Sequence, residues 1–326
     1  YYVFISKNYF LNVFMTIALL FPGQGSQYIG MGKDFYDKYE QARSIYNQLD
    51  FSLNRPLTDL IFNGTNEEIA LTTNSQPAIM ATSIVILRCL QHEKLIDLNN
   101  VSYTAGHSLG EYSSLVATES IDFKDAIKIL KVRSEAMQES MPVGTGGMAA
   151  IIGSSLSQIT ELLPELNKIG KIYVANDNAA GQIVLSGEIS AIDHICFNSK
   201  TYGIKKAIKL PVSAPFHCEL INSARSKIRT EIQNYNFKDF KFPLISNVEA
   251  RPCKSCEIGD LLANQVVSRV RWRESVEYMI KKKITTFIEI GPGNILSNIV
   301  KRMDRSLTSI SISKIDDFTK LKELIA

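Results

Sequence analysis

The chain has 326 residues, of which 45% are hydrophobic and 21% are charged, which is the composition of a globular protein with a substantial core. Its formal net charge of +3, spread without one long basic tract, argues against nucleic acid as a partner. Five cysteines in a chain too long to need disulfide bridges favour a reducing compartment.

Residues 1–14 are apolar and aromatic, but polar residues interrupt them between Ser6 and Asn12. A transmembrane span needs about 20 consecutive apolar residues, and cleavage of a signal peptide here would fall inside the fold. We therefore expect an N-terminal extension outside the fold, with Met15 as the true start, and a cytoplasmic protein. The alternative is the remnant of a targeting segment, which would place the protein in an organelle stroma or matrix.

Strand and helix signals alternate over the first 140 residues. Short apolar runs at 17–21 and 101–105 predict strands that are buried on both faces of a parallel sheet. Periodic apolar positions predict helices at 34–49, 77–92, 110–119 and 123–139. This part of the chain is predicted to be an α/β core.

The pattern changes between residues 143 and 211. Strands are predicted at 148–152, 171–175, 182–186 and 205–210, with helices at 155–166 and 189–202. This βαββαβ order is typical of a ferredoxin-like unit. The α/β pattern then resumes, with helices near 218–234, 257–267, 273–282 and 294–303 and strands near 242–246 and 286–290.

The predicted fold is therefore α/β, with a discontinuous large domain and an inserted small one. The large domain covers 15–142 and 212–326 around a parallel sheet, and the ferredoxin-like domain covers 143–211. A ligand is expected in the cleft between them.

Ser108 lies in the pentapeptide Gly-His-Ser-Leu-Gly at 106–110, between a predicted strand and a predicted helix. Gly-x-Ser-x-Gly in this context places the serine on a sharp turn with its hydroxyl exposed. An ordinary glycine-rich turn would give a similar pentapeptide, but the flanking elements favour a nucleophile.

A second glycine-rich turn, Gly23-Gln24-Gly25, follows the first predicted strand. Tyr28 stands where a dinucleotide-binding motif needs its last glycine, and the following residues fail the phosphate-loop pattern as well. The turn can instead offer backbone N–H groups, as an oxyanion hole requires.

Ser108 needs a base, and His217 is the main candidate because it ends a proline-containing loop at the return to the large domain. If His217 titrates as an ordinary histidine, the protein should lose activity as the pH falls through roughly 6 to 7 and the imidazole becomes protonated. His107 is expected to support the turn through hydrogen bonds. No acidic residue between Ser108 and His217 is a clear third member of a triad.

Taken together, these segments resemble the malonyl-CoA:acyl-carrier-protein transacylase family, which has the α/β-hydrolase-like fold. The resemblance runs in order over nearly the whole chain. The matching segments are 21–27 (FPGQGSQ), 106–112 (GHSLGEY), Arg133 with Met137, 176–187 (NDNAAGQIVLSG), 213–217 (SAPFH), Gln265 with 270–272 (VRW), and 289–293 (EIGPG).

The resemblance implies a Ser108–His217 dyad in which the backbone carbonyl of Gln265 replaces the acid of a triad. Changing the Gln265 side chain should then matter less than moving its backbone. The backbone N–H groups of Gln24 and Leu109 are implied to form the oxyanion hole.

The same resemblance assigns Arg133 to the free carboxylate of malonate, which the planar guanidinium can bind through two N–H groups. By composition alone, Arg133 would be a surface residue of an amphipathic helix. Further substrate-binding positions are implied at His107, Met137, Asn178 and Ile295.

The activity implied is ping-pong transfer of a malonyl group from malonyl-CoA to the phosphopantetheine thiol of acyl carrier protein. Neither a metal nor a redox cofactor is expected, and no nucleic acid, membrane or second subunit. A serine esterase or thioesterase is the alternative, and a non-catalytic module that binds carrier protein is a third interpretation. Because carrier proteins are acidic, the basic residues Arg269, Arg271, Arg273 and 281–283 are candidates for its docking surface.

Four remaining residues are interpreted as incidental. Cys253 and Cys256 form a lone C-x-x-C without the two further ligands that zinc needs. His92 and His194 lie in polar helical contexts and are expected at the surface.

Overall fold

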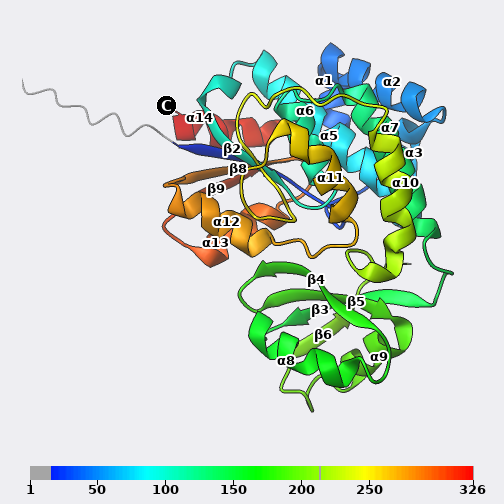
Figure 1. The fold of residues 1–326 in the computed structure, drawn as a ribbon. Coiled ribbons are helices and arrows are strands. Elements are labelled where there is room, and N and C mark those ends of the chain that lie inside the picture. The colour runs from blue at the N-terminus through cyan, green and yellow to red at the C-terminus, as the bar shows by residue number, and fades with distance from the viewer. Residues whose placement is uncertain (1–15, 213, 326) are drawn as a thin grey trace, which may run out of the picture.

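A computed structural model of the chain describes residues 16–212 and 214–325 (Figure 1). The extension predicted at 1–14 lies outside these residues. The described chain contains a five-stranded sheet and a separate four-stranded sheet. Figure 1 shows the smaller sheet below the larger one, with the two joined by several chain segments.

The larger sheet is parallel at every pairing and has the order β7-β2-β1-β8-β9. Its central strand β1 alternates between two packed layers. Leu19 and Phe21 join the larger hydrophobic cluster, whereas Ala18 and Leu20 join a second cluster on the other face. Burial on both faces explains the continuous apolar run of β1. The strands are β1 (Ile17–Phe21), β2 (Val101–Gly106), β7 (Leu244–Ile245), β8 (Thr286–Ile290) and β9 (Thr308–Ile312).

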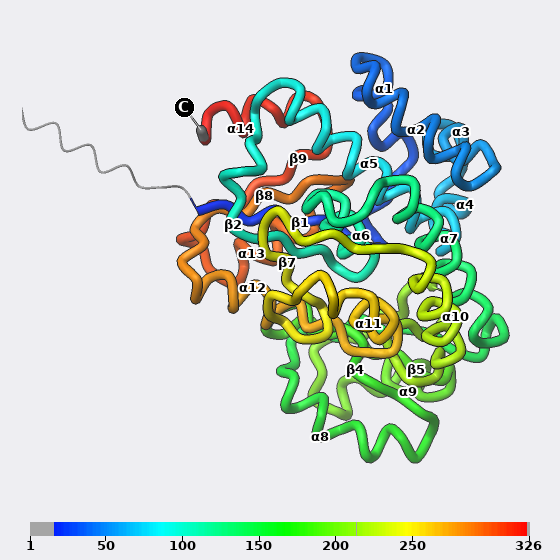
Figure 2. Tube along the Cα trace, turned by 45° about the horizontal axis from the view of Figure 1, so that its top comes forward, coloured from blue at the N-terminus to red at the C-terminus, as the bar shows by residue number. Residues whose placement is uncertain are grey.

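Helices cover both faces of this sheet. Figure 2 shows α12 and α13 beside one face, and α5 and α6 beside the other. The helices of the larger region are α1 (Lys33–Lys38), α2 (Glu40–Leu53), α3 (Leu57–Asn63), α4 (Asn66–Ala70), α5 (Thr72–His92), α6 (Gly110–Ala117), α7 (Phe123–Glu139), α10 (Asn222–Ile232), α11 (Ser255–Gln265), α12 (Trp272–Lys281), α13 (Ile295–Met303) and α14 (Phe318–Ile325). None of the described helices is long and apolar enough to cross a membrane.

The smaller sheet is antiparallel, with the order β4-β5-β3-β6. Its two helices pack on one face through apolar side chains such as Ile159 and Ile192, and in Figure 1 they lie on the side away from the larger sheet. The βαββαβ order predicted here is confirmed. The elements are β3 (Gly146–Ile152), α8 (Leu156–Leu166), β4 (Ile172–Ala179), β5 (Gln182–Glu188), α9 (Ile189–Phe197) and β6 (Lys206–Lys209).

Strand β4 ties the small sheet to the large region. It runs to Ala179, four residues past its predicted end. Its C-terminal half pairs with Val270, in the segment before α12. The Asp177 N–H donates to the Val270 carbonyl at 2.9 Å, and the Val270 N–H donates to the Ala175 carbonyl at 2.8 Å. The Arg273 side chain on α12 also donates to both oxygens of the buried Asp177 carboxylate. These contacts hold the two sheets in a fixed relation.

The elements differ from the prediction in three respects. The helix expected at 34–49 is two helices, because Tyr39 between them is extended, with φ −113° and ψ 131°. Helix α5 begins at Thr72 and continues through Pro77, which the sequence analysis takes as its first residue. Helices α3, α4 and α14 and strand β9 were not predicted.

Proline at position 77 deprives the Thr73 carbonyl of its helical N–H partner. The Arg55 guanidinium takes that place, since its Nη2 donates to the Thr73 carbonyl at 2.7 Å. Its Nη1 donates to the Asn74 side chain at 2.6 Å. The side chain of Arg55 therefore allows α5 to extend back to Thr72.

Candidate active site

The carboxyl ends of β1 and β2 lie side by side, with Phe21 in register with Gly106. In an open parallel sheet, ligands bind beyond the carboxyl ends of the strands. The turn after β1 carries Gln24 and the turn after β2 carries Ser108. Their neighbouring positions follow directly from the strand pairing.

Ser108 occupies a strained turn that close packing imposes. Its φ is +53°, in the left-handed region that a residue with a side chain adopts rarely. A Cβ on Gly106 would lie 1.9 Å from the Gly110 carbonyl carbon, and one on Gly110 would lie 2.2 Å from the Phe21 oxygen. Only glycine fits at either position. The two glycines thus let strand and helix approach closely enough to project the serine.

His217 faces the serine hydroxyl, with 2.8 Å between Ser108 Oγ and His217 Nε2. Its other nitrogen, Nδ1, lies 2.9 Å from the Gln265 backbone carbonyl. Because a carbonyl only accepts, Nδ1 carries the proton and Nε2 of the neutral ring is free to accept the serine proton. Burial, aided by the positive charge of Arg133, lowers the pKa of His217 to about 3.

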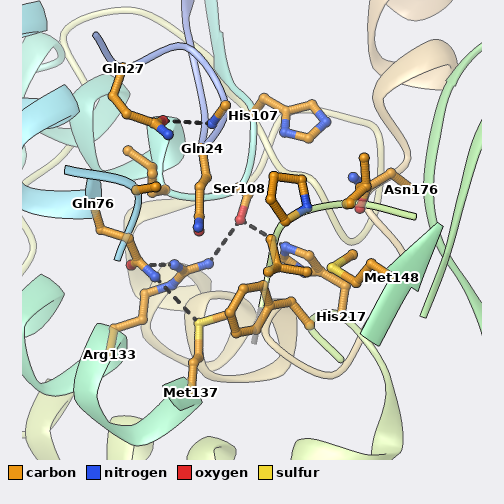
Figure 3. A pocket seen from close by; sticks show the side chains of 17 residues that line it. Gln24, Gln27, Gln76, His107, Ser108, Arg133, Met137, Met148, Asn176 and His217 are labelled. Atoms are coloured by element: carbon orange, nitrogen blue, oxygen red, sulfur yellow. Dashed lines mark hydrogen bonds between the residues drawn. The ribbon is translucent and has the colours of Figure 1, made fainter. Parts of the chain in front are cut away.

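Arg133 lies on α7 and is fully buried beside the nucleophile. Its Nη2 donates to Ser108 Oγ at 3.0 Å and to Gln265 Oε1 at 2.8 Å, while Nη1 donates to Gln76 Oε1 at 2.5 Å. The guanidinium also lies over the Tyr112 ring, 5.6 Å from its centre. Figure 3 shows the side chains of Arg133 and His217 converging on Ser108.

Two further residues hold the backbone of the serine. Asn247 follows β7, which pairs with β2, and its Oδ1 accepts the Ser108 N–H at 2.7 Å. Its Nδ2 donates to the Gly106 carbonyl at 2.7 Å. The Gln265 Nε2 donates to the Ser108 carbonyl at 2.9 Å. The Gln265 side chain thus contacts the site as closely as its backbone does, which the sequence analysis does not anticipate.

The backbone amides expected to form an oxyanion hole are available. Within residues 16–212 and 214–325, the N–H groups of Gln24 and Leu109 donate to no protein acceptor. The N–H of Ser108 itself is occupied by Asn247. Gln24 and Leu109 both line the cavity above the serine.

The cavity has a volume of about 210 Å³ and lies between the two sheets. Of the residues predicted to bind substrate, Met137 and His107 line it. Asn178 does not, and instead its Oδ1 lies 2.8 Å from His107 Nε2. Ile295 is the first residue of α13, also lies outside the lining and is 40% exposed. The full lining is Gln24, Gly25, Gln27, Ala70, Gln76, His107, Ser108, Leu109, Arg133, Met137, Met148, Asn176, Leu210, Pro211, Val212, Phe216 and His217.

Several residues at this site were not predicted from the sequence. Asn176 lines the cavity in the neighbourhood where Asn178 was expected, and Gln76 contacts both Arg133 and Met137. Gln76 precedes Pro77, the predicted start of α5, and so falls outside the predicted helix although it lies within the observed one. Asn247 carries no motif of its own, and only the pairing of β7 with β2 brings it to Ser108.

The remaining candidates lie away from the cavity. Among the described residues, no group of His, Cys, Asp and Glu has an arrangement that could hold a metal ion. Cys253 is buried and Cys256 exposed. His92 is exposed as expected, whereas His194 is half-buried, with Nε2 2.9 Å from the Tyr202 hydroxyl.

The arginines considered for carrier-protein docking are engaged within the chain. Arg269 and Arg271 both pair with Glu274, and Arg273 pairs with Asp177 and Glu277. None of the three lines the cavity. Docking of carrier protein on the basic stretch stays a prediction.

Residues 18–318 match the family of acyl transferase domains. The chain is 42% identical over 301 residues to a malonyl CoA-acyl carrier protein transacylase of Bacillus subtilis (strain 168), a match that covers 91% of this chain and 93% of that protein. The chain belongs to this transacylase family.

Solved structures agree with this assignment. An acyl-carrier-protein S-malonyltransferase from Bartonella henselae superposes with a TM-score of 0.92 at 36% identity, covering 95% of this chain and 99% of the other. A malonyl-transacylase solved in complex with its type II polyketide acyl-carrier protein superposes with a TM-score of 0.90 at 33% identity, covering 95% and 99%. The α/β-hydrolase-like fold predicted for the large region is thereby confirmed.

Proposed function

We propose that the chain transfers a malonyl group from malonyl-CoA to the phosphopantetheine thiol of acyl carrier protein. The observation that carries this proposal is the position of the Ser108 hydroxyl, which lies between a neutral imidazole and a buried guanidinium. A nucleophile beside a base suits acyl transfer, and a buried cation beside it suits an acyl group that bears its own carboxylate.

In the first half-reaction, Ser108 Oγ attacks the thioester carbonyl of malonyl-CoA while His217 Nε2 takes the hydroxyl proton. The negative oxygen of the tetrahedral intermediate is stabilised by the N–H groups of Gln24 and Leu109. The C–S bond then breaks, and His217 returns the proton to the leaving sulfur of CoA. The product is a malonyl ester on Ser108.

In the second half-reaction, the phosphopantetheine thiol attacks the ester carbonyl and gives its proton to His217. The C–O bond to Ser108 breaks, and His217 returns that proton to the serine oxygen. A second hollow shares Ala70 and residues 210–212 with the cavity and opens to solvent, which suits the entry of a long, thin thiol arm.

Selection for malonyl rests on Arg133 in this proposal. A malonate carboxylate would give the guanidinium a charged partner in place of the neutral serine hydroxyl, whereas an acetyl group would leave the buried cation without one. Gln76 and Gln265 hold the guanidinium from two sides, so its orientation is fixed before substrate binds.

The test is the covalent intermediate. Brief mixing with malonyl-CoA alone should add one malonyl group to the intact protein, on the peptide that contains Ser108, because no acceptor thiol is present. The matched control is Ser108→Ala, which should stay unmodified. Modification of the neighbouring Cys218 peptide, or none at all, would contradict the mechanism. Rapid loss of the label to water would favour the esterase alternative.

A further inference from the structure

Glu111 is a buried carboxylate directly behind the site. It lies on α6, three residues after Ser108, is 1% exposed and does not line the cavity. Its Oε1 accepts the Asn247 N–H at 3.3 Å, and its Oε2 accepts from the Gln265 side-chain nitrogen. Both of its donors, Asn247 and Gln265, also hold the Ser108 backbone.

Arg133 is a fully buried cation whose charge acts on this carboxylate, yet the two do not pair directly. In the described part of the chain the guanidinium forms no ion pair, and its three acceptors are the neutral oxygens of Gln76, Gln265 and Ser108. The Gln265 amide stands between the charges, with its oxygen toward Arg133 and its nitrogen toward Glu111. Each charge therefore fixes one end of the same amide.

We propose that Glu111 is a positioning residue that compensates the buried charge of Arg133 through the Gln265 amide, which leaves the guanidinium free to bind the carboxylate of the substrate. The inference rests on the proposed function, because it takes malonate as the ligand of Arg133. A buried cation without any compensating charge is costly. A carboxylate in direct contact would remove that cost but would occupy the N–H groups that malonate needs.

The hydrogen bonds that join Arg133, the Gln265 amide and Glu111 have a second effect, on the nucleophile Ser108. The Gln265 nitrogen has two hydrogens, and one donates to Glu111 while the other donates to the Ser108 carbonyl. A turned amide would bring its nitrogen toward Arg133, where two donors would oppose each other. Glu111 thus keeps the amide in the one orientation that serves both Arg133 and Ser108.

The decisive experiment moves the carboxylate from position 111 to position 265. The double variant Glu111→Gln/Gln265→Glu keeps the total charge and leaves the backbone carbonyl of residue 265 for His217. It places the carboxylate against Arg133, where it competes with malonate. Rates of Ser108 acylation by malonyl-CoA and by acetyl-CoA are measured by intact mass at pH 8, above the pKa of about 7 to which burial raises Glu111.

The malonyl-to-acetyl ratio of acylation rates should fall at least about tenfold in the double variant. The ratio is the right readout, because any disturbance of Ser108 affects both substrates. An unchanged ratio in a folded double variant would overturn the proposal.

The single variant Glu111→Gln tests the positioning role separately. It should lower malonyl acylation about tenfold or more and acetyl acylation less, since only malonyl depends on the orientation of Arg133. If Glu111 acted only as a competing negative charge, its removal would instead tighten malonyl-CoA binding, and that result would overturn the proposal.

The matched control is Glu289→Gln. Glu289 is also a fully buried carboxylate, but it accepts the N–H groups of Leu296 and Ser297 at 3.1 and 2.8 Å, at the start of α13. This variant should lower Tm without changing the malonyl-to-acetyl ratio. Equal changes of the ratio in Glu289→Gln and Glu111→Gln would mean that Glu111 serves only the fold. Failure of the wild-type protein to acquire a malonyl group would instead refute the proposed function itself.

Discussion

At the scale of single residues, the charge state of His217 determines the pH range in which the site can work. A base accepts a proton only while it is neutral, so activity is lost as pH falls through its pKa. Because burial and Arg133 lower that pKa to about 3, the imidazole stays neutral well below the range of an ordinary histidine. The sequence predicts that activity is lost at roughly pH 6 to 7, and the lowered pKa of His217 moves this loss to a lower pH.

In the Glu111→Gln variant, where residue 111 cannot titrate, single-turnover acylation of Ser108 by malonyl-CoA should accordingly stay nearly constant from pH 8 down to about pH 5. In the wild-type protein the rate should also fall as Glu111, whose pKa burial raises to about 7, takes up a proton. Far-UV circular dichroism at each pH separates loss of chemistry from acid unfolding. A midpoint between pH 6 and 7 in the folded Glu111→Gln variant would show that His217 titrates as an exposed histidine does.

Arg133 allows a second prediction at this scale. Arg133→Ala removes a charge-assisted, two-bond contact to the substrate carboxylate, which is worth about 3 kcal/mol, or roughly a hundredfold in rate. Malonyl-CoA should lose at least that much in kcat/KM, while acetyl-CoA loses nothing or gains. Arg133→Lys keeps the charge without the planar fork and should fall between. Equal losses on both substrates would assign Arg133 to the fold alone.

At the scale of elements, helix α5 depends on a side chain from outside it. Arg55→Ala leaves the Thr73 carbonyl without its donor, and the unfolding free energy should drop by about 1 to 2 kcal/mol. Gln76 lies in the same turn and holds Arg133, so KM for malonyl-CoA should rise as well.

The second-site variant Pro77→Ala is the control for this explanation. Alanine restores the backbone N–H that can donate to the Thr73 carbonyl, so it should recover most of the stability lost in Arg55→Ala. Thermal unfolding of the two single variants and the double variant measures the coupling. Additive effects would show that Arg55 stabilises α5 in another way.

The sequence predicts the elements around the site better than the contacts within it. Strand β1 is a continuous apolar run because both sheet faces are covered, and β1, β2 and β8 were found within one residue. Strand β9 has alternating serines in place of such a run, and it was missed. The role of the Gln265 side chain depends on partners more than 100 residues away, at Arg133 and Ser108, and no local pattern reports such a contact.

At the scale of the whole molecule, the relation between the two sheets rests on the backbone pairing of β4 with Val270 and on one ion pair with a buried carboxylate. Asp177 on β4 is 1% exposed, and Arg273 on α12 donates to both of its oxygens, at 2.8 to 3.1 Å. Asn176, the preceding residue, lines the cavity. The pair therefore fixes the wall of the cavity that the small sheet supplies.

Arg273→Ala should lower the unfolding free energy by about 1.5 to 3 kcal/mol, because it leaves a buried carboxylate without its charged partner. It should also raise KM for malonyl-CoA more than it lowers kcat, since Ser108 and His217 both lie outside the small sheet. Asp177→Asn in the same background removes the orphaned charge and should restore part of the stability. Loss of kcat alone would contradict this coupling of the cavity wall to the pair.

The position of β1 in the sheet also bears on how the protein is made. β1 is nearly the first described segment, but one of its two neighbours, β8, is synthesised some 270 residues later. During translation β2 can pair with one edge of β1 while the other edge stays uncovered. An uncovered edge of this kind invites pairing with other chains. Gln265, which orients His217, also emerges late. A nascent chain that ends before Gln265 should therefore lack acyltransferase chemistry and depend on chaperones, even though Ser108, Arg133 and His217 have all been made.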